Sequence, residues 1–360
     1  MKLPDLRLSL ASLTGLVCAL APPCGALDQP EAGAQTGSRL QGSQPPPCRV
    51  AMELLGRIDD GSGPGPLGLT VAGDHAYLAA WRRGLRVIQV SDPKAPREVG
   101  SCPIRGEARD VAVAGGYAYV AAREGGLRVL DVSDPRTPAE VGSYHTRGLA
   151  DAVAIAGKTA YVADNYDKED VVRGCLRAID VSDPKAPTEV GSVEEPGLFL
   201  GVALVGRYAY AAYKNDFLWV FDVSDPKRPV AVASCPGTGE GQGVALLGNR
   251  AYVADRDGFV HVVDVSDPKA PRLVGSSPDE PGIALAVAVA GDHAYVGSKR
   301  GVLHVLDVSN PQVPAWVGSY KTSGRANGVT AAGAHVYVNE GEGGLLILRP
   351  TVLRRGAKSP

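Results

Sequence analysis

The sequence predicts an all-β fold, a seven-bladed β-propeller with four strands in each blade. Two repeated features predict it. The segment 127–135, Leu-Arg-Val-Leu-Asp-Val-Ser-Asp-Pro, has five further copies, and the six prolines lie 42, 49, 42, 42 and 43 residues apart. A Gly followed four residues later by a Tyr occurs seven times, at Tyr77, Tyr119, Tyr161, Tyr210, Tyr252, Tyr295 and Tyr337. A period of about 40 to 45 residues divided into short strands is typical of propeller blades.

Length and composition restrict the number of domains and the classes of ligand. At about 150 residues per domain, 360 residues predict two or three domains, but the repeat predicts a single ring instead. The 45 Gly and 28 Pro supply turns between many short strands, and 44% hydrophobic residues are enough for a core. The net charge of −2 offers no surplus of Lys and Arg for nucleic acid or anionic lipid. Neither class of ligand is expected.

The N-terminal residues predict export rather than a part of the fold. Lys2 and Arg7 precede an apolar run over residues 8–21, and Cys24-Gly25-Ala26 follows as a cleavage pattern. Residues 1–26 therefore predict a signal peptide, too short for the roughly 20 residues of a membrane span. A lipid anchor through Cys18 or Cys24 is the alternative. Residues 27–48, rich in Gly, Gln, Ser and Pro, predict a disordered spacer.

The propeller is expected to occupy residues 49–350 as one domain. In the second repeat, residues 109–114 form the predicted inner strand, followed by strands at 117–122, 127–133 and 139–143. Gly115-Gly116 suits a tight hairpin, and Asp134-Pro135 suits a turn with a fixed proline φ. Inner strands such as 152–156 are apolar on both faces, as expected for a strand that has a blade on each side.

The two ends of the repeat array complement each other. Residues 52–56 match the outer-strand pattern seen at 97–100, and the seventh repeat stops after its third strand. We therefore expect residues 49–57 to supply the fourth strand of the last blade. Such closure removes the exposed edges of an open array. Residues 351–360 are expected to form a flexible tail.

The third-strand sequences Leu-Arg-Val-Leu-Asp-Val at 127–132, Leu-Trp-Val-Phe-Asp-Val at 218–223 and Leu-His-Val-Leu-Asp-Val at 303–308 carry a family resemblance. They resemble the LVIVD repeat of bacterial and archaeal cell-surface propellers, over about residues 49–350. The resemblance implies a secreted or surface-anchored propeller, and it implies no general set of catalytic residues. Gln89 and Arg349 depart from the pattern at the position of the aspartate.

The recurrent polar residues predict structure rather than chemistry. Five aspartates stand at one place beside a turn, where hydrogen bonds to local backbone are expected; they are Asp131, Asp180, Asp222, Asp264 and Asp307. The histidines lack the close spacing of metal ligands, so no metal, cofactor or catalytic residue is predicted. The insertion at 164–170 predicts a solvated loop. After signal cleavage Cys48, Cys102, Cys175 and Cys235 remain, and we expect mostly free thiols.

The candidate ligand or partner site is one face of the ring. Loops into inner strands and loops from second to third strands emerge together there, and they carry the non-repeating polar residues. The residues at the starts of the inner strands are expected to surround the channel mouth: Leu67, Arg109, Asp151, Leu200, Gln242, Leu285 and Asn327. Four polar residues are expected beside them: Asp164, Tyr213, Asp255 and Glu340. The eight polar members of the two groups form the candidate site. Function often resides on variable loops held by a rigid scaffold, although a solvated rim must be polar in any case.

The outer strands suggest a second surface. One position holds Glu98, Glu140 and Glu189 in blades 1 to 3, where charge is expected to protect the sheet edge from pairing. The same position holds Ala231 in blade 4 and larger apolar residues in blades 5 to 7. Those apolar residues, Leu273, Trp316 and Leu54, predict a docking surface on the rim, unless they are buried between blades.

Together these features predict a secreted or cell-surface, non-catalytic propeller that serves as a protein-interaction or ligand-binding scaffold in the bacterial envelope. We expect a monomer, without a transmembrane span, whose partner is an envelope or extracellular protein. The alternative is a secreted hydrolase or lyase with carboxylates at the channel mouth. That alternative predicts that Asp151, Asp255 and Glu340 cluster and have perturbed pKa values.

Overall fold

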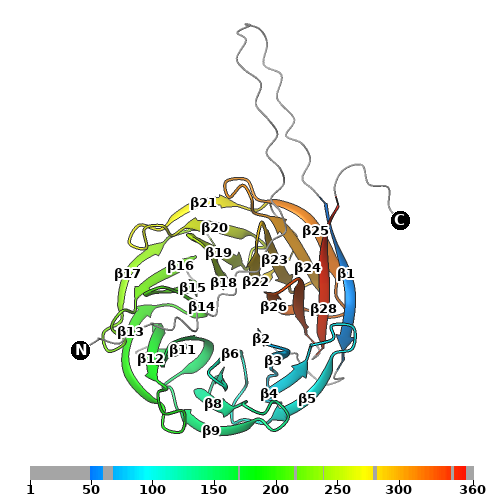
Figure 1. Ribbon diagram of the computed structural model, residues 1–360. Helices are drawn as coiled ribbons and strands as arrows, with labels where there is room; N and C mark the ends of the chain where they lie inside the picture. Colours follow the sequence, from blue (N-terminus) through cyan, green and yellow to red (C-terminus); the bar gives the residue numbers. More distant parts are fainter. Residues whose placement is uncertain are drawn as a thin grey trace, which may run out of the picture.

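The computed structural model describes residues 49–59, 68–168, 171–214, 217–237, 239–278, 282–341 and 344–353. Within them the chain forms seven antiparallel sheets of four strands, arranged as a ring around a central axis (Figure 1). The predicted fold is therefore confirmed. The expected signal peptide and spacer, residues 1–48, lie outside the described residues. In the described part of the chain there is no helix that could span a membrane.

Each blade has an inner, a second, a third and an outer strand. The inner strands are β2 (Leu69–Ala72), β6 (Asp110–Ala114), β10 (Leu149–Ala156), β14 (Phe199–Val205), β18 (Gly241–Leu247), β22 (Ala284–Ala290) and β26 (Ala326–Ala332). The second strands are β3 (His75–Ala79), β7 (Tyr117–Ala121), β11 (Thr159–Lys168), β15 (Tyr208–Tyr213), β19 (Arg250–Asp255), β23 (His293–Ser298) and β27 (His335–Glu340).

The third and outer strands complete the blades. The third strands are β4 (Leu85–Gln89), β8 (Leu127–Asp131), β12 (Val171–Asp180), β16 (Leu218–Asp222), β20 (Val260–Asp264), β24 (Val302–Asp307) and β28 (Leu345–Leu353). The outer strands are β5 (Arg97–Cys102), β9 (Ala139–Tyr144), β13 (Thr188–Pro196), β17 (Val230–Cys235), β21 (Arg272–Ser276), β25 (Ala315–Lys321) and β1 (Arg49–Ile58).

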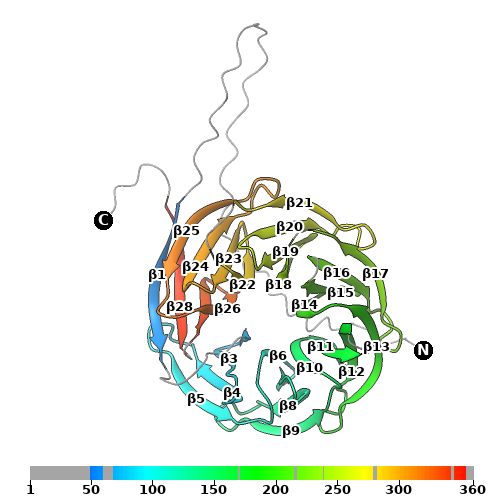
Figure 2. The ribbon, with the colours of Figure 1, turned by 180° about the vertical axis from the view of Figure 1, so that it is seen from behind.

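The first strand of the chain closes the ring. β1 pairs antiparallel with β28, with Arg49 opposite Leu353 and Ile58 opposite Leu345 (Figure 2). The predicted closure by residues 49–57 is thus confirmed. β28 continues to Leu353, past the expected domain end at 350, because residues 351–353 pair with residues 49–51.

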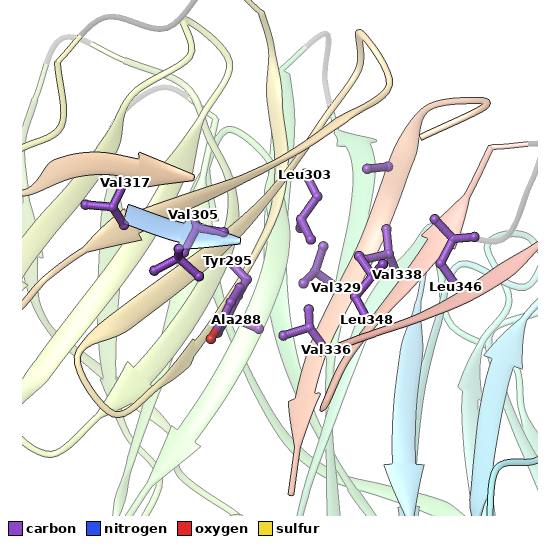
Figure 3. Close-up of a cluster of buried hydrophobic side chains, with 12 residues drawn as sticks. Ala288, Tyr295, Leu303, Val305, Val317, Val329, Val336, Val338, Leu346 and Leu348 are labelled. Carbon is purple, nitrogen blue, oxygen red and sulfur yellow. The ribbon is translucent and has the colours of Figure 1, made fainter. Parts of the chain in front are cut away.

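The core lies in the seams between blades. Figure 3 shows one seam, where Leu303 and Val305 of blade 6 pack near Val329, Val338 and further apolar side chains of blade 7. Six similar clusters fill the described parts of the other seams. Because each of the three inner strands of a blade has a neighbouring blade on both sides, apolar side chains predominate on both of its faces.

Neighbouring blades also interlock near the rim. A Cβ on Gly142 of an outer strand would lie 2.2 Å from the carbonyl oxygen of Pro184 in the next blade. Gly100 meets Pro135 in the same way, at 2.3 Å. Gly318 instead meets the carbonyl oxygen of Val50, because β1 enters the last blade there. At these positions the close approach of the next blade therefore leaves no room for a Cβ.

The face with the hairpins and Asp-Pro turns is nearly identical from blade to blade, and we call it the turn face. The backbone N–H of Ser133 donates to Asp131 Oδ1 at 2.9 Å, and that of Arg136 donates to Asp134 Oδ1 at 3.0 Å. The remaining third-strand aspartates of the repeated set bind backbone N–H groups in the same way: Asp180, Asp222, Asp264 and Asp307. These contacts are the expected local ones.

The insertion in the third blade differs from the expected solvated loop. Its residues lengthen β11 and β12, which pair from Thr159 opposite Asp180 to Lys168 opposite Val171. The added backbone groups hydrogen bond with each other, so an extra length of chain becomes sheet. β13 follows this extension as far as Pro196, opposite Arg173.

Candidate functional site

The opposite face carries the loops that precede inner strands and the loops that join second to third strands; we call it the variable face. Five inner strands have a β-bulge at the same place near this face. The bulged residues are Asp151, Leu200, Gln242, Leu285 and Asn327. A bulge inserts one unpaired residue and re-aims its side chain. All five are partly exposed, as is Arg109 at the corresponding place in blade 2, whereas Leu67 lies outside the described residues.

A chain of polar contacts links three blades at this face. Arg109 Nε of blade 2 lies 3.3 Å from Asp151 Oδ1 of blade 3. Asn165 Nδ2 donates to Asp151 Oδ2 at 2.9 Å and to the carbonyl oxygen of Phe199 in blade 4 at 2.8 Å. Burial lowers the pKa of Arg109, and Asp151 opposes that shift by stabilising the cation. The sequence placed Arg109 and Asp151 on one face but gave no sign of Asn165.

Four of the predicted site residues are buried rather than solvated. They occupy one equivalent position in their second strands, with exposed fractions of 0, 6, 1 and 2% for Asp164, Tyr213, Asp255 and Glu340. Each binds a backbone group of the segment that precedes its own inner strand. Asp164 Oδ1 accepts from the N–H of Gly148 at 3.1 Å, and Glu340 Oε1 accepts from the N–H of Ser323 at 2.6 Å. The expected open rim is wrong at these positions, because the loops fold over them.

The two other members of this set make the same kind of contact. Asp255 Oδ1 accepts from the N–H of Glu240 at 3.3 Å, and the hydroxyl of Tyr213 donates to the carbonyl oxygen of Pro196. Buried polar side chains that bind a loop backbone hold that loop in one conformation. These four residues therefore support the variable face from beneath.

The structure does not gather the three carboxylates of the hydrolase interpretation. They belong to blades 3, 5 and 7, and each has its own partner: Asp151 has Arg109, Asp255 has His261, and Glu340 has Arg57 at 3.3 Å. Burial opposes ionisation of Asp255, but hydrogen bonds from His261 and from backbone N–H groups outweigh it and lower the pKa of Asp255. Among the described residues, no group of three or more His, Cys, Asp or Glu is arranged to hold a metal ion.

The outer-strand glutamates form ion pairs that the sequence pattern did not predict. Each pairs with an arginine of the third strand in its own blade: Glu98 Oε2 with Arg86 at 2.6 Å, Glu140 Oε1 with Arg128 at 3.1 Å, and Glu189 Oε2 with Arg177 at 2.9 Å. The arginines are almost fully buried. These glutamates therefore neutralise buried cations, and their role as edge protection stays a prediction.

The three residues proposed for rim docking differ in exposure. Leu54 and Leu273 are 42% and 45% exposed. The Trp316 ring packs against His304 at a centroid distance of 5.4 Å, and its Nε1 donates to the carbonyl oxygen of Pro278 at 3.0 Å. Trp316 therefore packs partly between blades, which is the alternative to rim docking. Docking at Leu54 and Leu273 stays a prediction.

Blade 5 contains a Ser–His–Asp chain that sequence spacing did not reveal. His261 Nδ1 lies 2.8 Å from Ser276 Oγ, and His261 Nε2 lies 2.9 Å from Asp255 Oδ2. The Phe217 ring stacks on the imidazole at a centroid distance of 3.9 Å. The three residues come from the third, outer and second strands of one sheet, and only their cross-strand register brings them together.

Asp110 and the cysteines lie outside the contacts described so far. Asp110 accepts hydrogen bonds from the N–H groups of Val111 and Val153, at 2.8 and 3.0 Å, and so joins the inner strands of blades 2 and 3. Burial raises the pKa of Asp110. Among the described cysteines Cys102, Cys175 and Cys235, no disulfide forms, and Cys48 lies outside the described residues.

The fold and this site define a seven-bladed repeat propeller with one constant and one variable face. The chain belongs to the LVIVD-repeat family: the model of the LVIVD repeat matches residues 68–103, 105–146, 147–195, 197–236, 238–278 and 281–322. The six matches end before blade 7, which consists of β26, β27, β28 and β1. No curated protein matches the chain in sequence.

Solved structures show the same fold at low sequence identity. The structure of U3-55K has a TM-score of 0.67 and 12% identity, over 83% of this chain and 98% of that one. BamB from Moraxella catarrhalis has a TM-score of 0.57 and 15% identity, over 83% of this chain and 100% of that one. The computationally designed Ika8 protein has a TM-score of 0.58 and 11% identity, over 81% and 98%.

Proposed function

We propose that this protein is a non-catalytic scaffold whose variable face binds another protein. One observation carries the proposal: the contact chain from Arg109 through Asp151 and Asn165 to Phe199 joins three blades and is partly exposed at that face. A polar surface fixed before binding loses little conformational entropy when a partner docks. The turn face, in contrast, repeats the same local contacts and offers no comparable distinct surface.

The charge around this contact chain indicates the chemistry of the partner. We name the arginine sector by its members in the loops of blades 1 to 3: Arg82, Arg105, Arg109, Arg123 and Arg147. Glu107 neutralises part of it, at 3.5 Å from Arg82 and 3.8 Å from Arg123. Arg105 and Arg147 are exposed. The sector fits an acidic segment of a partner, since complementary charge speeds association and selects the partner.

The place of action is part of the proposal. The export pattern at residues 1–26 supports a secreted or envelope protein, and a lipid anchor through Cys18 or Cys24 is the alternative. The partner is then an envelope or extracellular protein. Fractionation of cells that express the full chain tests this, because protein confined to the cytosol would exclude both forms.

Crosslinking tests the docking face. Purified protein is crosslinked to native envelope extract, and the double variant Arg105→Glu/Arg147→Glu is compared with Lys94→Glu/Lys227→Glu on the turn face. We expect the first variant to lose a crosslinked partner that the second retains, and added salt to weaken the same crosslink. Equal crosslinking by both variants would exclude the arginine sector as the docking surface.

The Ser276–His261–Asp255 chain favours a second candidate, a serine hydrolase. Its parts also have structural explanations: the outer strands repeat the serine at Ser101, Ser143, Ser192, Ser234 and Ser319, and Phe217 covers the imidazole. A fluorophosphonate probe separates the two, because it labels activated serines. We expect no labelling at Ser276; labelling that Ser276→Ala abolishes would favour the hydrolase.

A further inference from the structure

One position of the inner strands has a different chemistry in blade 2 from that in the other six blades. Blade 2 has Asp110 there, opposite Ala121 of β7. The same position, opposite the equivalent residue of each second strand, holds only glycine or alanine elsewhere: Gly68, Ala152, Gly201, Gly243, Ala286 and Gly328. The repeat therefore does not need a polar side chain at this place.

Small residues are expected there because neighbouring inner strands approach each other closely. A Cβ on Gly68 of blade 1 would lie 2.4 Å from Asp110 Cα and 2.6 Å from Asp110 Oδ1. A Cβ on Gly201 of blade 4 would lie 3.3 Å from Gly243 Cα in blade 5. The side chain at this position thus meets the inner strand of the next blade, and Gly68 leaves room for the carboxylate of Asp110.

The carboxylate of Asp110 is unfavourable for the fold by itself. Its hydrogen-bond donors are neutral N–H groups, that of Val111 at 2.8 Å and that of Val153 at 3.0 Å. Burial raises the pKa of Asp110, although both hydrogen bonds favour the ionised form. An alanine, as in blades 3 and 6, would avoid burial of a charge. The packing of the ring alone therefore does not explain the aspartate.

The carboxylate joins two strands at the beginning of the contact chain on the variable face. Asp110 directly follows Arg109, and Val153 lies two residues after Asp151. The contact between Arg109 Nε and Asp151 Oδ1 is thus flanked by a hydrogen bond between the same two blades. Asp151 is a bulged residue, so the pairing of β10 with β11 does not fix it. Groups that bind a partner are held more precisely when a second layer of contacts supports them.

We propose that Asp110 is a positioning residue for partner docking, an inference that rests on the proposed scaffold function. Its carboxylate joins β6 to β10 and so fixes Arg109 and Asp151 in the arrangement that the acidic segment of the partner meets. Asp110 itself does not touch the partner. Residues that depart from the rules of a fold without a structural gain are typical of functional sites.

Amide hydrogen exchange tests the contact in the absence of a partner. Asp110→Ala removes the acceptor of the Val153 N–H. We therefore expect the Val153 amide to exchange about three- to tenfold faster in this variant when measured by NMR, as the loss of one net hydrogen bond predicts. The amides of β22 in blade 6 should keep their rates. Equal exchange of Val153 in both proteins would overturn the proposal, because the carboxylate would then not join the strands.

A peptide probe tests the effect on docking. Fluorescein-labelled hexaglutamate represents the acidic segment, and its binding to the full chain is measured by fluorescence anisotropy at low salt. We expect Asp110→Ala to weaken binding about three- to tenfold, because the arginines remain but are less well pre-organised. The melting temperature of this variant should equal or exceed that of wild type, whereas loss of a merely structural residue would lower it. Ala286→Gly, at the same position in blade 6, should leave peptide binding unchanged.

Asp110→Asn is the conservative comparison. Its side-chain oxygen can accept from the N–H of Val153, whereas its amide nitrogen cannot accept from that of Val111. Peptide binding by this variant should therefore lie between that of wild type and that of Asp110→Ala.

Two results would overturn the positioning role and leave the scaffold function intact. One is equal peptide binding by wild type and Asp110→Ala, and the other is weaker binding that accompanies a lower melting temperature. A wild-type protein that neither binds the peptide nor crosslinks a partner would exclude the scaffold function itself, and the positioning role with it, even if exchange of Val153 depends on Asp110.

Discussion

Blades 1 to 3 and blades 4 to 7 share one repeat, yet they have different types of side chain at the same third-strand position between blades. The middle of the third strand holds Arg86, Arg128 and Arg177 in the first group. It holds Trp219, His261, His304 and Leu346 in the second. The outer-strand position changes with it, from glutamate to alanine, leucine or tryptophan. A buried cation needs a carboxylate, and an apolar side chain does not, so the two positions form one unit.

Blade 3 shows the most elaborate form of the charged version. Arg177 Nε contacts Asp164 Oδ2 at 2.7 Å in addition to Glu189, and the hydroxyl of Tyr144 in blade 2 donates to Glu189 Oε2 at 2.7 Å. Blades 1 and 2 have alanine where blade 3 has Asp164. The arginine–glutamate pair therefore gains additional hydrogen-bonding partners in blade 3, the blade that also contains the long β11–β12 extension.

The largest expected effect follows from breaking that network. Arg177→Met leaves Asp164 fully buried without its cation, so we expect a loss of about 3–5 kcal/mol in the free energy of unfolding. Denaturant titration measures it. Arg86→Met is the matched control, since its partner Glu98 is partly exposed and should cause a smaller loss. Equal losses in the free energy of unfolding would show that the contact of Arg177 with Asp164 adds no stability beyond that of an arginine–glutamate pair.

The rim glycines provide a second test. Gly142→Ala places a Cβ at 2.2 Å from the carbonyl oxygen of Pro184, so a loss of about 1–3 kcal/mol is expected from overpacking. Blade 4 already has Ala233 at this place. The reverse change Ala233→Gly should therefore alter stability by less than Gly142→Ala does. Thermal unfolding of the two variants measures both changes, and a larger change for Ala233→Gly would contradict the prediction.

Replacing the charged pair of one blade by an apolar pair tests whether the two positions are coupled. Arg86→Leu/Glu98→Leu gives blade 1 the pair found in blade 7. We expect the double variant to lie within about 1 kcal/mol of wild type, because a buried ion pair and an apolar pair are often equivalent. Arg86→Leu alone should be less stable than the double variant. Additive losses in the double-mutant cycle would contradict this coupling.

The smallest effect concerns the turn face. The backbone N–H of Ser182 and its hydroxyl lower the pKa of Asp180 below its ordinary value of 3.8. Asp180 therefore adds stability above about pH 4, and this is lost as the pH falls through its folded-state pKa. Asp180→Gln copies Gln89 of blade 1 and should cost at most about 0.5 kcal/mol at pH 7. Unfolding curves of the two proteins should converge at low pH.

The repeat predicted the blade number, the strand order and the closing strand, because each depends on spacing along the chain. It did not predict the partners of the buried arginines. A bulge between Val129 and Leu130 shifts the pairing of β8 with β9 and sets Glu140 beside Arg128. One extra residue in an outer strand leaves no clear mark in a sequence pattern, so the repeat does not predict these ion pairs.

The candidate site was predictable only in part for a similar reason. Sequence spacing placed Arg109, Asp151, Asp164 and Glu340 on one face. Whether a residue there is exposed depends on how the preceding loop folds over it, and that loop is the least regular part of each repeat. Asp151 stays partly exposed because it is bulged, whereas Asp164 lies one layer below and is buried.

The pairing of β1 with β28 has a consequence for assembly of the chain. Arg349 Nη2 contacts Glu53 Oε2 across 296 positions of sequence, so the last blade joins the two ends of the repeat array. Closing so long a loop is entropically unfavourable and slow compared with forming local hairpins. During synthesis β1 leaves the ribosome before every other strand, whereas its partner in the sheet, β28, leaves last. Final closure of the ring must therefore wait for the C-terminal strand.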